Sequence, residues 1–264
     1  MKKSTKSPLK NKPLRLPGQS LNNEIRFLID DKALNYILLP IFLLVFTIWN
    51  WLLHYQIIKI TPSSLKFLTL FTILISIYCV FRIFKLIRKI KRLKLGRDGE
   101  IAVGQTLEYL RNKGFRIFHD IIGEGFNLDH VIVGEQGIFC VETKTYSKPS
   151  KGQCKITINH EGISVNGSKP NSKIFSQAKA QKAWLERKIS LLTGINVPVQ
   201  PVVVFPGWFV DNKLDDNSIW FLEPKGLLKY IEKAKVTLDK RTVKFISNQL
   251  SQFIRDNYDY NQYY

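Results

Sequence analysis

Cysteine, histidine and methionine are scarce in this 264-residue sequence, which has three, four and one of them. Cys79, Cys140 and Cys154 give neither an even-numbered disulfide framework nor a paired metal-ligand motif, and this favours a reducing compartment. The histidines beyond residue 100 lack the spacing of zinc ligands. Acidic residues are also few, with 21 Asp and Glu against 40 Lys and Arg, so the formal net charge is +19. The sequence therefore argues against a disulfide-stapled fold and a zinc module.

The positive charge is distributed unevenly along the chain. Residues 1–97 hold 18 Lys and Arg against three acids, a net charge of +15, whereas residues 98–264 hold 22 against 18, a net charge of +4. Apolar residues make up 45% of the sequence, too many for a disordered chain. Most of the charge excess thus lies outside the part expected to fold as a soluble domain, and it does not by itself identify a nucleic-acid-binding protein.

Two long apolar runs precede residue 82. The first has no Asp, Glu, Lys or Arg between Ala33 and Ile58, and its central 17 residues, 37–53, would cross roughly 25 Å as a helix. The second, 67–81, is shorter, but Lys66 and Arg82 at its ends can snorkel to the interfaces. Both runs are apolar around the whole circumference, which favours a transmembrane helical hairpin over buried core helices.

The basic residues predict the orientation of this hairpin. Eight Lys and Arg precede the first run and eight more lie within 82–97, whereas the connection holds only Lys59, with Lys66 at its edge. By the positive-inside rule both termini face the cytoplasm, in a multi-pass protein of the cell's inner (plasma) membrane. The basic segment after the second run can also attract anionic lipid.

Beyond the hairpin, the pattern predicts an α/β domain with one mixed sheet flanked by helices. The motif Gly96-Arg97-Asp98-Gly99 predicts a break, after which a new amphipathic helix runs over 100–112. Strands are expected at 115–121, 127–133, 138–144, 153–158, 162–165, 197–205 and 218–222, and helices at 174–193, 224–235 and 242–258. The expected domains are a basic cytoplasmic segment (1–32), two transmembrane helices (33–87), a basic linker helix (88–97), the main domain (98–210) and a C-terminal strand with helices packing on it (211–264).

Two neighbouring strands carry the chemistry. A turn over 134–137 sets an antiparallel register in which residue 133 faces 138 and Asp129 lies opposite Glu142. Two like charges at opposed positions, with Cβ atoms about 5 Å apart, are destabilising unless something positive lies between them. The period of two places Lys144 on the same face as Glu142. Such oxygen ligands suit Mg²⁺, which could activate a water and stabilise charge on a scissile phosphate, although an edge-strand salt bridge of Lys144 is an alternative.

A family resemblance then becomes visible in several blocks that occur in order. These are Gly99-Glu100 opening a helix, residues 127–134, residues 137–144, residues 170–177 entering the next helix, and residues 201–207. Together they resemble the nuclease-related domain (NERD) family, a branch of the PD-(D/E)XK nuclease superfamily. The resemblance covers about residues 96–210 and implies a restriction-endonuclease-like sheet flanked by helices.

The resemblance implies a role for six groups. Asp129 and Glu142 would bind Mg²⁺ or Mn²⁺ with the carbonyl of Thr143, and Lys144 would be the catalytic lysine. Glu100 would help to bind metal or orient a ligand, and Gln177 would approach the site from the following helix. From the residues alone, Glu100 can instead be a first-turn acid favoured by the helix dipole, and Gln177 an exposed helix residue. Leu128 stands where the superfamily has proline.

Charge on either side of these strands is asymmetric. Residues 98–143 hold eight acids and three Lys and Arg, whereas 144–188 carry a net charge of +8. An acidic side that binds metal and a basic side that binds phosphate fit a metal-dependent endonuclease acting on DNA in preference to RNA. A non-catalytic, membrane-tethered nucleic-acid-binding or scaffold protein remains an alternative, as does a domain that contacts only other proteins. The oligomeric state stays open.

Overall fold

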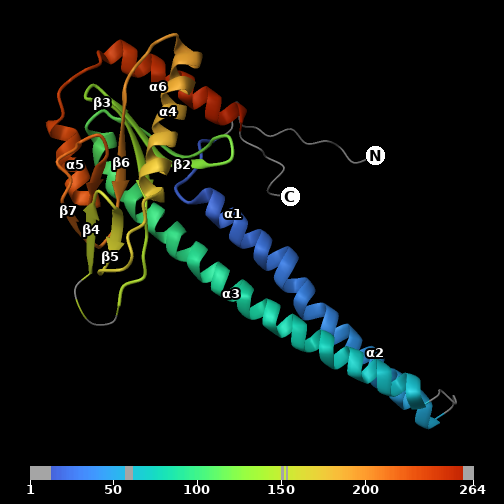
Figure 1. Ribbon diagram of the computed structural model, residues 1–264. Helices are drawn as coiled ribbons and strands as arrows, with labels where there is room; N and C mark the ends of the chain where they lie inside the picture. Colours follow the sequence, from blue (N-terminus) through green and yellow to red (C-terminus); the bar gives the residue numbers. More distant parts are fainter. Residues whose placement is uncertain (1–12, 57–61, 150–151, 153, 258–264) are drawn as a thin grey trace, which may run out of the picture. The chain divides into compact units, whose positions relative to one another are not determined.

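The computed structural model describes residues 13–56, 62–149, 152 and 154–257. The chain divides into two compact units. One unit comprises residues 21–94, and the other comprises the residues up to Ser20 together with those from Leu95 onward. We call them the hairpin unit and the nuclease-like unit and describe each separately (Figure 1).

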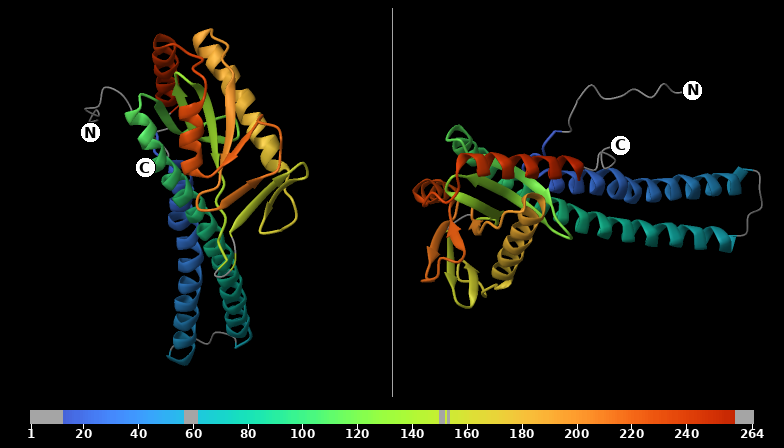
Figure 2. Two further views of the ribbon diagram at one scale, coloured as in Figure 1. Left: turned by 90° about the vertical axis from the view of Figure 1, so that its left-hand side faces the viewer. Right: turned by 90° about the horizontal axis from the view of Figure 1, so that it is seen from above.

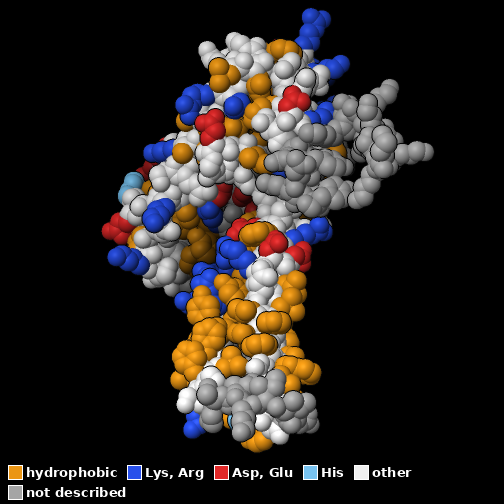
Figure 3. Space-filling view, turned by 90° about the vertical axis from the view of Figure 1, so that its right-hand side faces the viewer, with side chains coloured by type: hydrophobic (Ala, Val, Ile, Leu, Met, Phe, Trp, Pro, Cys, Tyr) orange, Lys and Arg blue, Asp and Glu red, His pale blue; other side chains and the backbone are white. Residues whose placement is uncertain are grey.

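All described residues of the hairpin unit are helical. It contains most of α1 (Gln19–Phe27), a π-helical turn (Leu28–Ala33), α2 (Leu34–Gln56) and the first part of α3 (Pro62–Asn112). Two of its helical stretches are long and apolar enough to cross a membrane. Hydrophobic side chains cover much of the surface of this unit in Figure 3. The predicted helix pair is thus confirmed, while the middle of its predicted connection, residues 57–61, lies outside the described residues.

The predicted break at Gly96–Gly99 is wrong, because α3 continues through it without interruption to Asn112. Glycine in a helix interior costs only about 1 kcal/mol relative to alanine, and packing can offset that. At Gly99 the packing reason is clear: a Cβ there would lie 2.0 Å from the Thr145 hydroxyl oxygen. This glycine permits close contact between α3 and the chain just after the third strand, and it does not end a helix.

The nuclease-like unit is built on a five-stranded sheet with the order β1-β2-β3-β6-β8. Its strands are β1 (Arg116–Ile122), β2 (Asn127–Gly134), β3 (Gly137–Thr143), β6 (Val199–Val204) and β8 (Trp220–Leu222). The first three pair antiparallel, and β6 and β8 add in parallel to β3. The predicted mixed sheet is therefore confirmed, but the prediction of a single sheet is wrong, because two of the expected strands pair in a second sheet.

Helices cover both faces of this sheet, as Figure 2 shows. On one face, α4 (Lys173–Thr193) and α6 (Lys240–Asp256) pack against inward side chains such as Val131 and Cys140. On the other face, α5 (Pro224–Lys233) and the end of α3 pack against residues such as Ile132 and Val141. The alternation of neighbouring residues between the two cores follows the period of two in a strand.

A second, three-stranded sheet has the order β5-β4-β7. It contains β4 (Lys155–Asn159) and β5 (Gly162–Val165), both expected from the sequence, and β7 (Phe209–Asn212), which was not. The strand β7 has no fully buried position and so lacks a hydrophobic pattern. Trp208 before it is a core residue, whereas Phe209 is 68% exposed. Residue 153, the predicted start of β4, lies outside the described residues.

Candidate functional site

The register of β2 and β3 places the two predicted carboxylates. Val133 pairs with Ile138 and Val131 with Cys140, as the sequence predicts, and the ladder runs to His130 and Val141. One step further, the Asp129 carboxylate accepts a hydrogen bond of 2.7 Å from the Thr143 backbone N–H. By strand alternation, Asp129 and Glu142 lie on the face that carries Val131 and Cys140.

Glu142 is 5% exposed, and both of its carboxylate oxygens accept hydrogen bonds. Lys144 Nζ donates to Oε1 at 2.5 Å, and Gln177 Nε2 donates to the same oxygen at 2.7 Å. Gln181 Nε2 donates to Oε2 at 2.5 Å. The Lys144 amine also donates to Gln177 Oε1 at 3.0 Å, which closes a ring of three side chains. A carboxylate this deeply buried is stable only with such partners, because water no longer solvates it.

The structure thus brings Lys144 and Gln177 to Glu142, in agreement with the placement that the sequence predicts. Gln181 is a residue that sequence reasoning missed, although it is 2% exposed. It lies four positions after Gln177 on α4, and residues at this spacing share one helix face. The i, i+4 pair of glutamines was the signal that could have found it.

Glu100 reaches the same region from α3 and is 8% exposed. Burial, followed by the charges of Asp120 and Glu142, raises the pKa of Glu100 to about 8. A backbone hydrogen bond from Gly18 and the charge of Lys144 act in the opposite direction. The interpretation of Glu100 as a first-turn acid favoured by the helix dipole is therefore wrong, because α3 begins at Pro62 and Glu100 lies far inside this helix, close to other carboxylates.

Asp129 belongs to the same electrostatic cluster. Desolvation, together with the charges of Glu142 and Glu100, raises the pKa of Asp129 well above its usual range. The hydrogen bond from Thr143 and the charge of Lys144 only partly compensate. Three carboxylates from α3, β2 and β3 therefore repel one another in a poorly solvated place, and a bound cation would relieve that repulsion.

The donor chemistry of this cluster fits a hard divalent cation. Carboxylate oxygens are the ligands that Mg²⁺ and Mn²⁺ prefer, and the raised pKa values of Glu100 and Asp129 reflect burial together with the closeness of other carboxylates. Among the residues that the structure describes, no group of three or more His, Cys, Asp or Glu side chains could hold a metal ion. A cation here would therefore take only part of its coordination from side chains, and the rest from backbone carbonyl groups or water.

A buried histidine pair lies behind the site on the opposite face of the sheet. His119 on β1 pairs with His130 on β2, and their Nδ1 atoms are 2.8 Å apart. His130 Nε2 is 3.3 Å from the Thr143 hydroxyl. Burial lowers the pKa of His119 to about 4 and that of His130 well below its usual range, so both rings are neutral at pH 7. The sequence excluded zinc spacing here but did not reveal that the two rings touch.

The comparisons with known proteins place part of this chain in a family. Residues 95–206 match the NERD family, described as nuclease-related domain. The match spans α3 from Leu95, the strands of the site and β6, and so includes Glu100, Asp129, Glu142 and Lys144. No curated protein and no solved structure matches the chain. Residues 95–206 are therefore a nuclease-related domain, as the blocks in the sequence indicate.

Proposed function

We propose that the protein is a membrane-anchored, metal-dependent nuclease that hydrolyses phosphodiester bonds of DNA on the cytoplasmic side. The observation that carries the proposal is the convergence of Asp129 and Glu142 on one face of the sheet, with the Lys144 amine bound to Glu142. The match of residues 95–206 to a nuclease-related domain supports it.

Each group at the site has a role in this proposal. Asp129 and Glu142, with the Thr143 carbonyl, would hold Mg²⁺ or Mn²⁺, and Glu100 would orient a ligand. The bound ion would supply a lowered pKa for a water molecule and positive charge near the scissile phosphate. The Lys144 amine orients the attacking water or stabilises the developing negative charge. Gln177, together with Gln181, fixes the rotamer of Glu142 through its two oxygens.

The membrane anchor is the second part of the proposal. Two helical stretches of sufficient length and apolar character support it, as do the eight basic residues on each flank of the pair. In this arrangement the nuclease-like unit lies on the cytoplasmic side, where nucleic acid is present.

The preference for nucleic acid is supported by the basic stretch after β3. Several of its cationic side chains are exposed on the loop after β3, on the loop before α4 and on α4, among them Lys148, Lys169, Lys173, Lys179 and Arg187. Exposed cations on one segment can contact a phosphate backbone without reading its sequence. Lys151, part of the same stretch, lies outside the described residues.

A non-catalytic scaffold is the second candidate function, because one specific contact favours it. Lys144 and two glutamine amides already satisfy both oxygens of Glu142, as expected of a purely structural ion pair. A binding protein that retains the nuclease fold would show the same contact. The two candidates differ in what happens to a bound nucleic acid.

A cleavage assay on the full chain in nanodiscs separates these two candidates. Supercoiled plasmid and a single-stranded RNA are incubated with Mg²⁺, with Mn²⁺ or with EDTA, and binding is measured in parallel. We expect metal-dependent cleavage of DNA that Lys144→Ala abolishes while binding persists. Lys229→Ala removes an exposed lysine on α5, which covers the opposite face of the sheet, and serves as the matched control. Binding without any metal-dependent cleavage in the unaltered protein would establish the scaffold instead.

A further inference from the structure

The segment that precedes α2 belongs in part to the nuclease-like unit. Residues up to Ser20 group with the residues from Leu95 onward, although they lie before the first apolar helix in the chain. We call residues 13–20 the N-terminal strap. Leu14 in the strap packs against the same core as α4 and α6, so the strap is a built part of this unit.

A buried ion pair fixes the strap to β1. Arg15 Nε and Nη2 donate to the same carboxylate oxygen of Asp120, at 3.0 and 2.6 Å, and both side chains are 3% exposed. The Ser20 backbone N–H and hydroxyl donate to that oxygen as well, at 2.7 and 2.9 Å. Removing one partner of a buried pair leaves an uncompensated charge and is strongly destabilising, so this pair holds the strap in one position on β1.

The strap also lies directly against α3 on both sides of Glu100. Gly18 adopts a φ of +71°, and a Cβ there would lie 2.9 Å from the Cγ atom of Arg97. A Cβ at Gly104 would lie 2.9 Å from the Cγ atom of Pro17. Between these two contacts, the Gly18 backbone donates a hydrogen bond to the Glu100 carboxylate. The strap thus holds one carboxylate of the candidate site through its main chain.

A second route leads from the strap to Glu142. The other oxygen of Asp120 accepts a hydrogen bond of 3.3 Å from Asn127 Nδ2. The Asn127 carbonyl accepts one of 3.2 Å from Gln181 Nε2, which also donates to Glu142. Arg15 is therefore linked to Glu142 through three intermediate residues, Asp120, Asn127 and Gln181.

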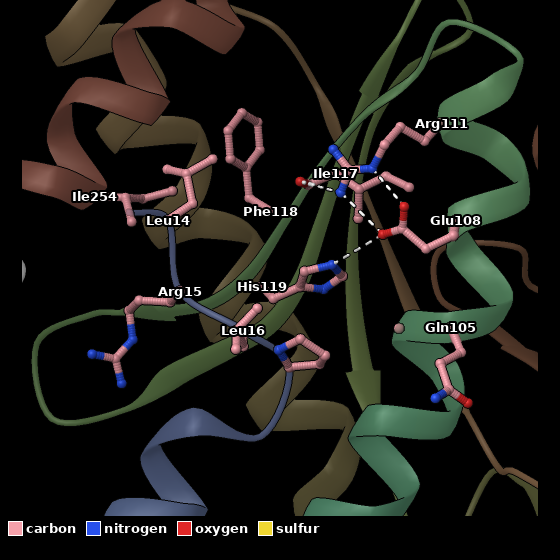
Figure 4. Close-up of a pocket in the computed structure, with 12 residues that line it drawn as sticks. Leu14, Arg15, Leu16, Gln105, Glu108, Arg111, Ile117, Phe118, His119 and Ile254 are labelled. Carbon is pink, nitrogen blue, oxygen red and sulfur yellow. Dashed lines mark hydrogen bonds and ion pairs between the residues drawn. The ribbon is translucent and has the colours of Figure 1, made fainter. Parts of the chain in front are cut away.

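Figure 4 shows a cavity next to the strap. The strap forms one wall of a cavity of about 250 Å³, with His119 and Glu108 on another wall. The Arg15 guanidinium points away from those two side chains in this view, consistent with its bond to Asp120. Leu14 and Pro17 of the strap therefore contact the domain through apolar groups, while Arg15 binds it through Asp120.

From these contacts we propose that the N-terminal strap is an intramolecular positioning element of the nuclease site, with Arg15 as its positioning residue. Through Gly18 it fixes Glu100, and through Asp120 and Gln181 it fixes Glu142, so two carboxylates from different elements keep one arrangement. The inference rests on the proposed function, because it concerns the same site. The segment before the two apolar helices thus has a role in positioning the carboxylates of the site.

The test measures Mn²⁺ affinity of the full chain in nanodiscs by calorimetry, together with DNA cleavage. Arg15→Ala should weaken Mn²⁺ binding and cleavage by about 10- to 100-fold, the usual effect of removing a group that supports a metal ligand. Arg15→Lys should rescue part of the loss, since it restores the charge but not the two-nitrogen contact. Lys113→Ala, which removes an exposed ion pair with Glu232, is the matched control and should leave both values unchanged.

A double-mutant cycle separates positioning from general destabilisation. In a Glu100→Gln background, Arg15→Ala should weaken Mn²⁺ binding by a smaller factor than in the unaltered chain, because one of its two routes no longer exists. Gly18→Ala, which keeps the Arg15–Asp120 pair but is strained at a φ of +71°, should resemble Arg15→Ala. If Arg15→Ala fails to fold, Gly18→Ala provides the same comparison.

Failure of the strap and failure of the nuclease proposal give different results. Unchanged Mn²⁺ affinity and cleavage in the folded Arg15→Ala and Gly18→Ala proteins would overturn the strap and leave the nuclease intact. A chain that binds Mn²⁺ but cleaves no nucleic acid would overturn the nuclease, while Mn²⁺ affinity would still test the strap. A chain that binds no Mn²⁺ would overturn both.

Discussion

The two units differ in which side chains they expose: the hairpin unit has leucines on its surface, and the nuclease-like unit has them in its core. In the hairpin unit, leucines such as Leu44 and Leu74 are about half exposed, while Thr47 and Thr72 meet between the helices with their hydroxyl oxygens 2.8 Å apart. In the nuclease-like unit, Leu107 is fully buried. Leu74 and Leu107 lie on one helix, α3, so helix propensity does not explain the difference. The expected surroundings explain the difference in burial, because exposed leucine side chains are unfavourable in water but not in the hydrocarbon of a membrane.

The largest expected effect compares these two leucines directly. Leu107→Ala should lower the free energy of unfolding of the nuclease-like unit by about 2–5 kcal/mol, because it leaves a cavity in a packed core. Leu74→Ala should leave the stability of that unit unchanged. Thermal unfolding of both variants in the same detergent, followed by tryptophan fluorescence, measures the difference. Equal losses in the two variants would show that the same core encloses both residues.

A lysine introduced on an exposed helix surface should affect the hairpin unit and leave the nuclease-like unit unaffected. Leu74→Lys should cost about 2.5–3.5 kcal/mol of membrane insertion, if the residue lies near the centre of a span. Leu191→Lys, at a position 81% exposed on α4, should have no effect on insertion. The fraction of protein retained in membranes after carbonate extraction checks both. Full retention of Leu74→Lys would contradict the proposed anchor.

The buried histidines give a pH test that concerns only the nuclease-like unit. Burial lowers the pKa of His119 from about 6.5 to about 4, so between these pH values the unfolded chain binds a proton that the folded chain does not. Stability therefore falls as the pH drops from 6.5 to 4, by up to about 3 kcal/mol from this residue. Other carboxylates titrate in the same range, so the measurement is the difference between the unaltered protein and His119→Gln. The variant should show a shallower decline, and parallel curves would refute this assignment.

The smallest expected effect comes from surface ion pairs. Lys182 and Glu186 on α4 approach to 3.8 Å at i, i+4 spacing, and both side chains are more than 30% exposed. Lys182→Ala should change the free energy of unfolding by less than about 0.5 kcal/mol, because water and salt screen such pairs. Chemical denaturation at low and high salt measures it. A loss of several kcal/mol would mean that Lys182 takes part in a buried network.

The sequence predicted the parts of the site that follow from local rules. The turn after Gly134 fixes the register of β2 and β3, and the period of two then brings Asp129 and Lys144 to the side of Glu142. Gln177 followed from the family resemblance. The roles of these residues in catalysis stay predictions, because the geometry alone tests only their placement.

The parts that escaped prediction depend on contacts between distant segments. Arg15 and Asp120 are 105 positions apart, and no period or spacing relates them. The histidine pair needed the β1–β2 register before His119 could be placed against His130. The supposed break at Gly99 failed for a related reason, because the residue that accounts for this glycine, Thr145, comes 46 positions later.

Close contact at Gly99 also limits which sequences can build this site. With a Cβ only 2.0 Å from the Thr145 oxygen, any other amino acid would act as a wedge between α3 and the chain leaving β3. Glu100 is the next residue on α3, so a wedge of even one methyl group would carry its carboxylate away from Glu142. The acid cluster thus depends on the missing side chain of residue 99, whose place the Thr145 side chain occupies, and a substitution that changes no charge could dismantle it.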